Sequence, residues 1–145
     1  KSEPSASALF YMSAGQCNYY LGMYEEALAH YQVASKRDKE DVLKGQIAYN
    51  KGLANARLSK YQDAIDDYCE SISVTDPGKQ AQAQFQLGAT LRKIANNGIP
   101  DRHGRSPATL LEESIQALQT ACTLSQNDPN FLNNLGLSQF EAEQY

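Results

Sequence analysis

The chain of 145 residues has no tryptophan, only two histidines and only three cysteines. Cys17, Cys69 and Cys122 are scattered, odd in number and without Cys-x-x-Cys spacing, which disfavours a disulfide framework and a thiolate metal site. His30 and His103 lie far apart in the sequence, so a histidine metal site is also disfavoured. We therefore expect reduced thiols, no metal and no cofactor, in an intracellular, cytoplasmic protein.

Long apolar runs and an excess of positive charge are missing as well. No run of about 18 apolar residues occurs, so the sequence predicts no membrane-spanning helix. Lysine and arginine total 13 against 17 aspartates and glutamates, a net charge of −4 at pH 7. This balance argues against nucleic acid and against an acidic membrane surface as partners.

The sequence also lacks a catalytic constellation. The acidic pairs Glu25-Glu26, Asp66-Asp67 and Glu112-Glu113 are adjacent residues, which point about 100° apart on a helix, and we expect all three on exposed helix faces. Strings such as Leu-Gly-Ala-Thr are not phosphate loops, because no strand precedes them and no Gly-Lys-Ser/Thr follows. The chain is therefore not expected to be an enzyme.

The sequence does contain a segment that recurs along the chain. It reads GQCNYYLGMYEEALAHYQVA from Gly15 and GLANARLSKYQDAIDDYCES from Gly52. Parts of it return as LLEESIQALQTA from Leu110 and LGLSQFEAEQY from Leu135. Self-similarity at a nearly fixed period predicts stacked units, each of which contacts its neighbours along the chain.

Each unit reads as two helices joined by a tight turn. In the first unit, apolar or small residues at Phe10, Ala14, Cys17 and Leu21 are spaced four, three and four apart, which is one face of a helix. Gly22 suits a helix C-terminus because glycine accepts the left-handed conformation. A second helix is expected from about Tyr24, and the pattern then repeats.

This pattern resembles the tetratricopeptide repeat family, whose units carry Leu-Gly and a Tyr in helix A, then Tyr-x-x-Ala, an aromatic residue, an Ala and a Pro in and after helix B. The matching positions are Tyr11, Gly15, Tyr19, Tyr24, Ala27, Tyr31 and Ala34; Gly52, Tyr61, Ala64, Tyr68 and Pro77; Leu87, Gly88, Ser114, Leu118, Ala121 and Pro129; and Leu135 and Gly136. The chain departs from the family in having Ala14 and Lys51 where Leu is usual. The resemblance implies an all-α fold of tandem antiparallel helix pairs, stacked in a right-handed superhelix of about three and a half repeats.

We expect one domain over residues 1–145. Its repeats cover about 8–41, 45–78 and 81–128, followed by a partial repeat at 129–145. The third repeat carries an insertion at 96–107, which reads either as a solvated, mobile loop or as a contact loop special to this protein. Because Tyr145 stands where a new Tyr-x-x-Ala would begin, we expect the chain to be a fragment of a longer repeat protein.

Small residues inside the helices predict close helix packing. Mid-helix glycine costs about 1 kcal/mol relative to alanine, so Gly15, Gly52, Gly88 and Gly136 indicate close approach of a neighbouring helix. We expect Ala27, Ala64 and Ser114 opposite them, and the bulky Tyr31, Tyr68 and Leu118 between units. Cys17 and Cys122 fall where a repeat buries small residues.

The resemblance implies that the A helices line a concave groove. The side chains placed there are Met12, Gln16, Tyr20, Tyr49, Asn50, Leu53, Arg57, Phe85, Gln86, Arg92, Lys93 and Asn134. This aromatic, amide and cationic set predicts a protein-interaction module for a protein or peptide segment, acidic, with aromatic or aliphatic anchors. The alternative is a structural scaffold subunit in a large multi-protein assembly, such as ciliary or cell-cycle machinery. The sequence leaves the oligomeric state open.

One partner class is expected to be absent. Some members of the family bind the acidic C-terminal tails of chaperones with a clamp of Lys, Asn, Asn, Lys and Arg. Those places fall on Met12, Gln16, Asn50, Gln82 and Gln86, where only Asn50 matches. Amides cannot replace the charge-assisted bonds that a carboxylate pair needs, so we expect no binding of chaperone tails.

Overall fold

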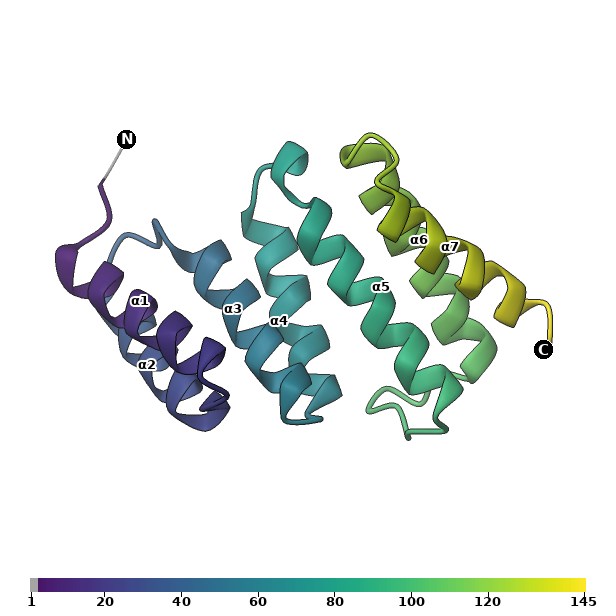
Figure 1. The fold of residues 1–145 in the computed structure, drawn as a ribbon, viewed down its shortest axis with the longest axis horizontal. Coiled ribbons are helices and arrows are strands. Elements are labelled where there is room, and N and C mark those ends of the chain that lie inside the picture. The colour runs from purple at the N-terminus through teal and green to yellow at the C-terminus, as the bar shows by residue number, and fades with distance from the viewer. Residues whose placement is uncertain (1–2) are drawn as a thin grey trace. The chain divides into compact units, whose positions relative to one another are not determined.

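The computed structural model describes residues 3–145, and throughout this range the regular elements are helices (Figure 1). There are seven α-helices and one short 3-10 turn at Pro77–Lys79, and no strand occurs in the described range. The helices are α1 Ala6–Tyr20, α2 Tyr24–Arg37, α3 Lys44–Arg57, α4 Tyr61–Val74, α5 Ala81–Asn96, α6 Pro107–Leu124 and α7 Pro129–Ala142. The expected all-α class is confirmed.

The chain divides into two compact units, Lys1–Val74 and Thr75–Tyr145. In the first unit, α1 packs on α2, α3 on α4, and α2 also contacts α3. In the second unit, α5 packs on α6 and α6 on α7. Figure 1 shows α1 and α2, and likewise α3 and α4, as antiparallel neighbours. The expected helix pairs are therefore present, with α7 following the third pair.

Capping side chains mark the starts of α1 and α6. Ser5 accepts a hydrogen bond from the backbone N–H of Ala8, and Ser106 accepts one from Thr109 at 3.2 Å. Pro107 occupies the first turn of α6, where its missing N–H costs nothing. These caps satisfy backbone donors that a helix N-terminus leaves unpaired, so the start of α6 lies where the Ser-Pro dipeptide predicts it.

The turns that close the first two helix pairs share one backbone geometry. Gly22 has φ +79° and Ser59, 37 residues further along, has φ +62°. In both turns the next N–H reaches back to an asparagine carbonyl, from Met23 to Asn18 and from Lys60 to Asn55, each at 2.8 Å. The left-handed conformation is natural for glycine, whereas serine is strained in it.

Ser59→Gly should therefore stabilise the first unit. We expect a gain of about 0.5–1 kcal/mol, the relief of the left-handed strain less the extra flexibility of glycine in the unfolded chain. The reverse change, Gly22→Ser, should cost a similar amount. Urea unfolding of both variants checks the pair, and a destabilised Ser59→Gly protein would contradict the assigned turn.

At three of the mid-helix glycines, the nearest side chain across the helix pair is the bulky residue of the partner helix. A Cβ on Gly52 would lie 2.5 Å from Cε1 of Tyr68, and a Cβ on Gly88 would lie 2.6 Å from Cγ of Leu118. A Cβ on Gly15 would collide with the ring of Tyr31. The expectation of a small residue opposite is confirmed at Gly88, whose carbonyl accepts a hydrogen bond from Oγ of Ser114 at 2.7 Å. At Gly15 and Gly52 the tyrosine ring of the partner helix fills the space that the missing Cβ leaves. Close approach itself is confirmed at these three, whereas Gly136 has nothing within 4 Å.

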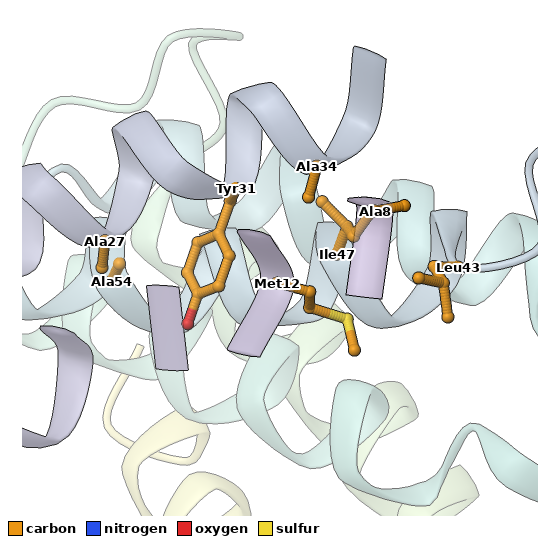
Figure 2. Close-up of a cluster of buried hydrophobic side chains, with 8 residues drawn as sticks. All are labelled: Ala8, Met12, Ala27, Tyr31, Ala34, Leu43, Ile47 and Ala54. Atoms are coloured by element: carbon orange, nitrogen blue, oxygen red, sulfur yellow. The ribbon is translucent and has the colours of Figure 1, made fainter. Parts of the chain in front are cut away.

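The core of the first unit is drawn in Figure 2. It comprises Ala8, Met12, Ala27, Tyr31, Ala34, Leu43, Ile47 and Ala54. Burial raises the pKa of Tyr31 to about 12, as expected when a phenolate loses its hydration. Met12 points into this core, so its prediction as a groove residue is wrong.

The insertion between α5 and α6 is folded onto its own unit. The guanidinium of Arg105 donates to both carboxylate oxygens of Asp101, from Nε at 2.8 Å and from Nη2 at 2.9 Å. Its third nitrogen donates to Glu113 of α6 at 2.6 Å, and the Asp101 side chain is 0% exposed. The loop is thus anchored at its C-terminal end, which differs from a merely solvated insertion.

Candidate partner-binding surface

Tyrosines and one arginine gather where α1, α2 and α3 meet in the first unit. Tyr19 contacts Tyr20 and Tyr24 edge-on, with ring centroids 5.5 and 5.4 Å apart. The guanidinium carbon of Arg57 lies 5.7 Å from the Tyr19 centroid and 5.8 Å from the Tyr24 centroid. Arg57 Nε also donates to the Tyr19 hydroxyl at 3.3 Å. We call these four residues the tyrosine–arginine cluster.

The cluster is held in place but remains open to solvent. The hydrogen bond to Tyr19 is the main cause that raises the pKa of Arg57, and a guanidinium is in any case a cation at ordinary pH. Within residues 3–145 no carboxylate pairs with Arg57. Tyr20 is 83% exposed. An exposed cation and an exposed ring therefore both contact Tyr19, a combination that can receive a carboxylate and an apolar group together.

The remaining predicted residues of this unit differ in exposure. Gln16 is exposed on α1, while Asn50 and Leu53 are half-buried on α3. Tyr49 is also half-buried and lies 6.0 Å, centroid to centroid, from the buried Tyr68. Part of Tyr49 therefore serves the packing of its own helix pair.

In the second unit the predicted residues are largely engaged with their own neighbours. Phe85 stacks on Phe131 with centroids 4.3 Å apart. Arg92 forms a two-pronged ion pair with Glu141, at 2.5 and 3.0 Å. The prediction of Arg92 as a cation offered to a ligand is therefore corrected, because its charge is already paired. Gln86 is half-buried on α5 and Lys93 is exposed there, and the Asn134 amide donates to the carbonyl of Asn130 at 3.0 Å.

The Arg92–Glu141 pair predicts a pH dependence. The hydrogen bond from Arg92 lowers the pKa of Glu141 below its usual value. A carboxyl whose pKa is lower folded than unfolded stabilises the fold above its unfolded pKa, and this stabilisation is lost as pH falls through the folded value. Wild type should therefore lose more unfolding free energy between pH 6 and pH 3 than Glu141→Gln does. Equal losses in both proteins would contradict the pairing.

Two polar pairs were missed by the sequence reasoning. Asn18 contacts His30 at 2.5 Å (Oδ1 to Nδ1), and Asn55 Nδ2 donates to Asp67 at 2.7 Å. Both pairs join helix A to helix B at the same repeat positions, so comparing the two units 37 residues apart could have found them. Burial is the main cause that raises the pKa of Asp67, so the expectation that Asp67 lies on a solvated face is wrong.

The cysteines and the acidic residues show no assembled site in the part of the chain that the structure describes. Cys17 and Cys69 are exposed and Cys122 is buried, so the expected burial of Cys17 is wrong. Among residues 3–145, no three side chains of the metal-ligating kinds come together. Over the same residues, no helix combines the length and apolar character needed to cross a membrane.

The helix pairs, their three-residue turns and the glycine–ring contacts define a tetratricopeptide repeat fold, as the sequence resemblance implied. No protein-family model matches the chain. In sequence it is similar to the Photosystem I assembly protein Ycf3 of Synechococcus elongatus, 25% identical over 146 residues that cover 97% of this chain and 83% of that protein. The same protein of a second Synechococcus strain gives identical values.

Solved structures agree on the fold. The first TPR of Spaghetti (RPAP3), bound to HSP90 peptide SRMEEVD, has a TM-score of 0.75 at 20% identity and covers 96% of this chain and 98% of its own. The second TPR domain of human RPAP3, in complex with HSP70 peptide SGPTIEEVD, has a TM-score of 0.71 at 19% identity, over 92% and 95%. MamA of Desulfovibrio magneticus has a TM-score of 0.57 at 21% identity, over 97% and 88%.

These comparisons bear on the expected absence of chaperone-tail binding. Two of the structural neighbours are themselves complexes with HSP90 and HSP70 peptides. The exclusion drawn from the clamp positions is therefore not borne out.

Proposed function

We propose that this chain is a protein-interaction module that binds an acidic partner segment along the A helices of its first unit, α1 and α3. The observation that carries the proposal is the tyrosine–arginine cluster, in which Arg57 is solvent-exposed, has no carboxylate partner in the described range and is positioned by two rings. Binding by the peptide-bound structural neighbours supports the same class of function.

The geometry suggests how such a segment is held. Arg57 uses only Nε within the cluster, which leaves its terminal nitrogens for the two oxygens of a carboxylate. Because the guanidinium already rests on Tyr19 and Tyr24, it loses little rotamer freedom on binding. Tyr20 offers an exposed ring to an aromatic or aliphatic anchor, and Asn50 can donate to and accept from an extended backbone.

A peptide titration tests this proposal. The probe is a synthetic peptide with alternating Asp or Glu and Leu or Phe, compared with its Asn/Gln version and with the HSP90 peptide SRMEEVD. Arg57→Gln should weaken binding of the acidic probe at least about tenfold and flatten its salt dependence. Tyr20→Ala should weaken it by a similar factor without changing the salt slope.

Arg37→Gln is the matched control, because Arg37 lies 5.5 Å from the Tyr11 centroid in the same unit but outside the cluster. Its affinity should equal that of wild type. Binding that survives Arg57→Gln unchanged, or that is lost equally in Arg37→Gln, would reject the cluster as the anchor.

The alternative is a structural scaffold in a multi-protein assembly, and the similarity to a Photosystem I assembly protein favours it. A scaffold buries large surfaces at once rather than one short segment. Failure of every short probe, with retention of the full chain in a large complex, would support the scaffold over the peptide-binding module.

A further inference from the structure

Tyr68 on α4 carries a hydroxyl that its packing does not require. Its side chain is fully buried, and its ring fills the space beside Gly52. In the third helix pair the same space, beside Gly88, is filled by Leu118, which has no polar atom. Among residues 3–145, the Tyr68 hydroxyl is buried without a hydrogen-bond partner. A hydroxyl in this condition destabilises a fold, whereas a phenylalanine ring would pack equally well, so a partner from outside the chain explains it best.

The hydroxyl is directed towards the A helices of the first unit. The ring passes α3 at Gly52, where a Cβ would lie 2.5 Å from Cε1 and 3.0 Å from Cζ, the carbon that carries the oxygen. The Tyr49 ring, on α3 about one turn before Gly52, lies 6.0 Å from the Tyr68 ring, centroid to centroid. Burial raises the pKa of Tyr68, and the phenols of Tyr49 and Tyr19 raise it further. The oxygen therefore lies beside the surface that also carries the tyrosine–arginine cluster.

The surroundings of the Tyr68 hydroxyl favour an uncharged acceptor over a carboxylate. With its pKa raised, the phenol keeps its proton and can donate at ordinary pH. The neighbouring cations of α3 have other contacts, since Lys51 lies 3.9 Å from the Asp67 carboxylate and Arg57 lies over the Tyr19 ring. A carboxylate brought to a buried phenol without a cation would lose its hydration uncompensated. A backbone carbonyl carries no charge, and an extended segment presents one at every residue.

We propose that the Tyr68 hydroxyl donates a hydrogen bond to a backbone carbonyl of the acidic segment bound along α1 and α3. This inference rests on the proposed function and adds a second kind of contact to it. Arg57 recognises the charge of a side chain, whereas Tyr68 holds the main chain. Tyr49, half-buried at this place, turns aside as the segment enters. A main-chain bond adds affinity without selecting a sequence, so it acts on charged and uncharged segments alike.

Removal of this single oxygen tests the proposal. Tyr68→Phe keeps the ring beside Gly52, so circular dichroism should show an unchanged fold. Titrated with the acidic probe and with its Asn/Gln version, the variant should bind both about five- to tenfold more weakly than wild type, with an unchanged salt slope. Its urea midpoint should rise by about 0.5 M, because the unpaired hydroxyl no longer destabilises the free protein.

Tyr11→Phe is the matched control, because Tyr11 is a half-buried tyrosine of the same unit that lies beside Arg37, outside the cluster. It should bind both probes as wild type does. Equal weakening in Tyr11→Phe, or a Tyr68→Phe protein that binds both probes unchanged, would overturn the proposal. A loss confined to the acidic probe would also overturn it, since the hydroxyl would then contact a side-chain carboxylate.

The remaining outcomes separate this inference from the proposed function. If Arg57→Gln weakens binding of the acidic probe while Tyr68→Phe does not, the interaction module stands and the main-chain contact is rejected. If wild type binds neither probe, both are rejected. Weaker binding combined with a lower urea midpoint would assign the hydroxyl to the packing of the first unit and reject its role as a donor to the segment.

Discussion

Gly52→Ala is expected to destabilise the first unit by about 1–3 kcal/mol, although alanine favours the helix by about 1 kcal/mol. The added Cβ would lie 2.5 Å from Cε1 of Tyr68 and 2.7 Å from its Cδ1. Tyr68 is fully buried, and its hydroxyl has no hydrogen-bond partner among the described residues. The ring therefore cannot swing into free space, and overpacking outweighs the gain in propensity.

The control for this prediction sits at the same repeat position. Gly136 is exposed and a Cβ there would meet nothing within 4 Å, so Gly136→Ala should stabilise α7 by up to about 1 kcal/mol. Denaturant unfolding of both variants measures the two changes in unfolding free energy, which should have opposite signs. Two changes of the same sign would show that the glycine–ring contact does not set the outcome.

Arg105→Ala is expected to cost about 3–5 kcal/mol, the range found when one partner of a buried ion pair is removed. The change leaves Asp101, whose side chain is 0% exposed, without its two-pronged partner. It also frees Glu113 on α6 from its ion pair at 2.6 Å. The insertion should then detach from α6.

Unfolding free energy and hydrogen exchange over residues 97–106 measure this effect. His103→Ala, an exposed position in the same loop, should stay within about 0.5 kcal/mol of wild type. If Arg105→Ala were equally neutral, the loop would be a solvated insertion after all, as one reading of its sequence held.

The repeat pattern was enough to predict the helix pairs, because their determinants are local. Glycine after Leu21, Ser106 before Pro107, and the spacing of Ala27 and Tyr31 each specify one turn, cap or face. The helices begin and end close to the residues that these signals indicate. The same locality explains why the close approach at Gly15, Gly52 and Gly88 was foreseen.

The candidate surface was harder to predict, because its residues are paired over long distances in the sequence. Arg92 meets Glu141 49 residues away, and Phe85 meets Phe131, so neither is as available as its helix position suggested. Met12 differs from Gln16 by one helical turn, yet one is buried and the other exposed. Successive residues on a helix point about 100° apart. The pattern in the sequence is therefore too coarse to decide whether a residue at the border between two faces lies in the groove or in the core.

The short turns of this fold have a consequence for the order in which it forms. The first two helix pairs close across residues 21–23 and 58–60, whereas the third pair must close across residues 97–106. Contacts of such low sequence separation favour folding in microseconds to milliseconds. Each doubling of loop length adds about 0.6 kcal/mol to the entropic cost of closing the loop, so the hairpin of α5 and α6 should be the slowest of the three to close. The contacts of Arg105 offset this entropic cost only after α6 has formed, so they stabilise the closed hairpin without speeding its closure.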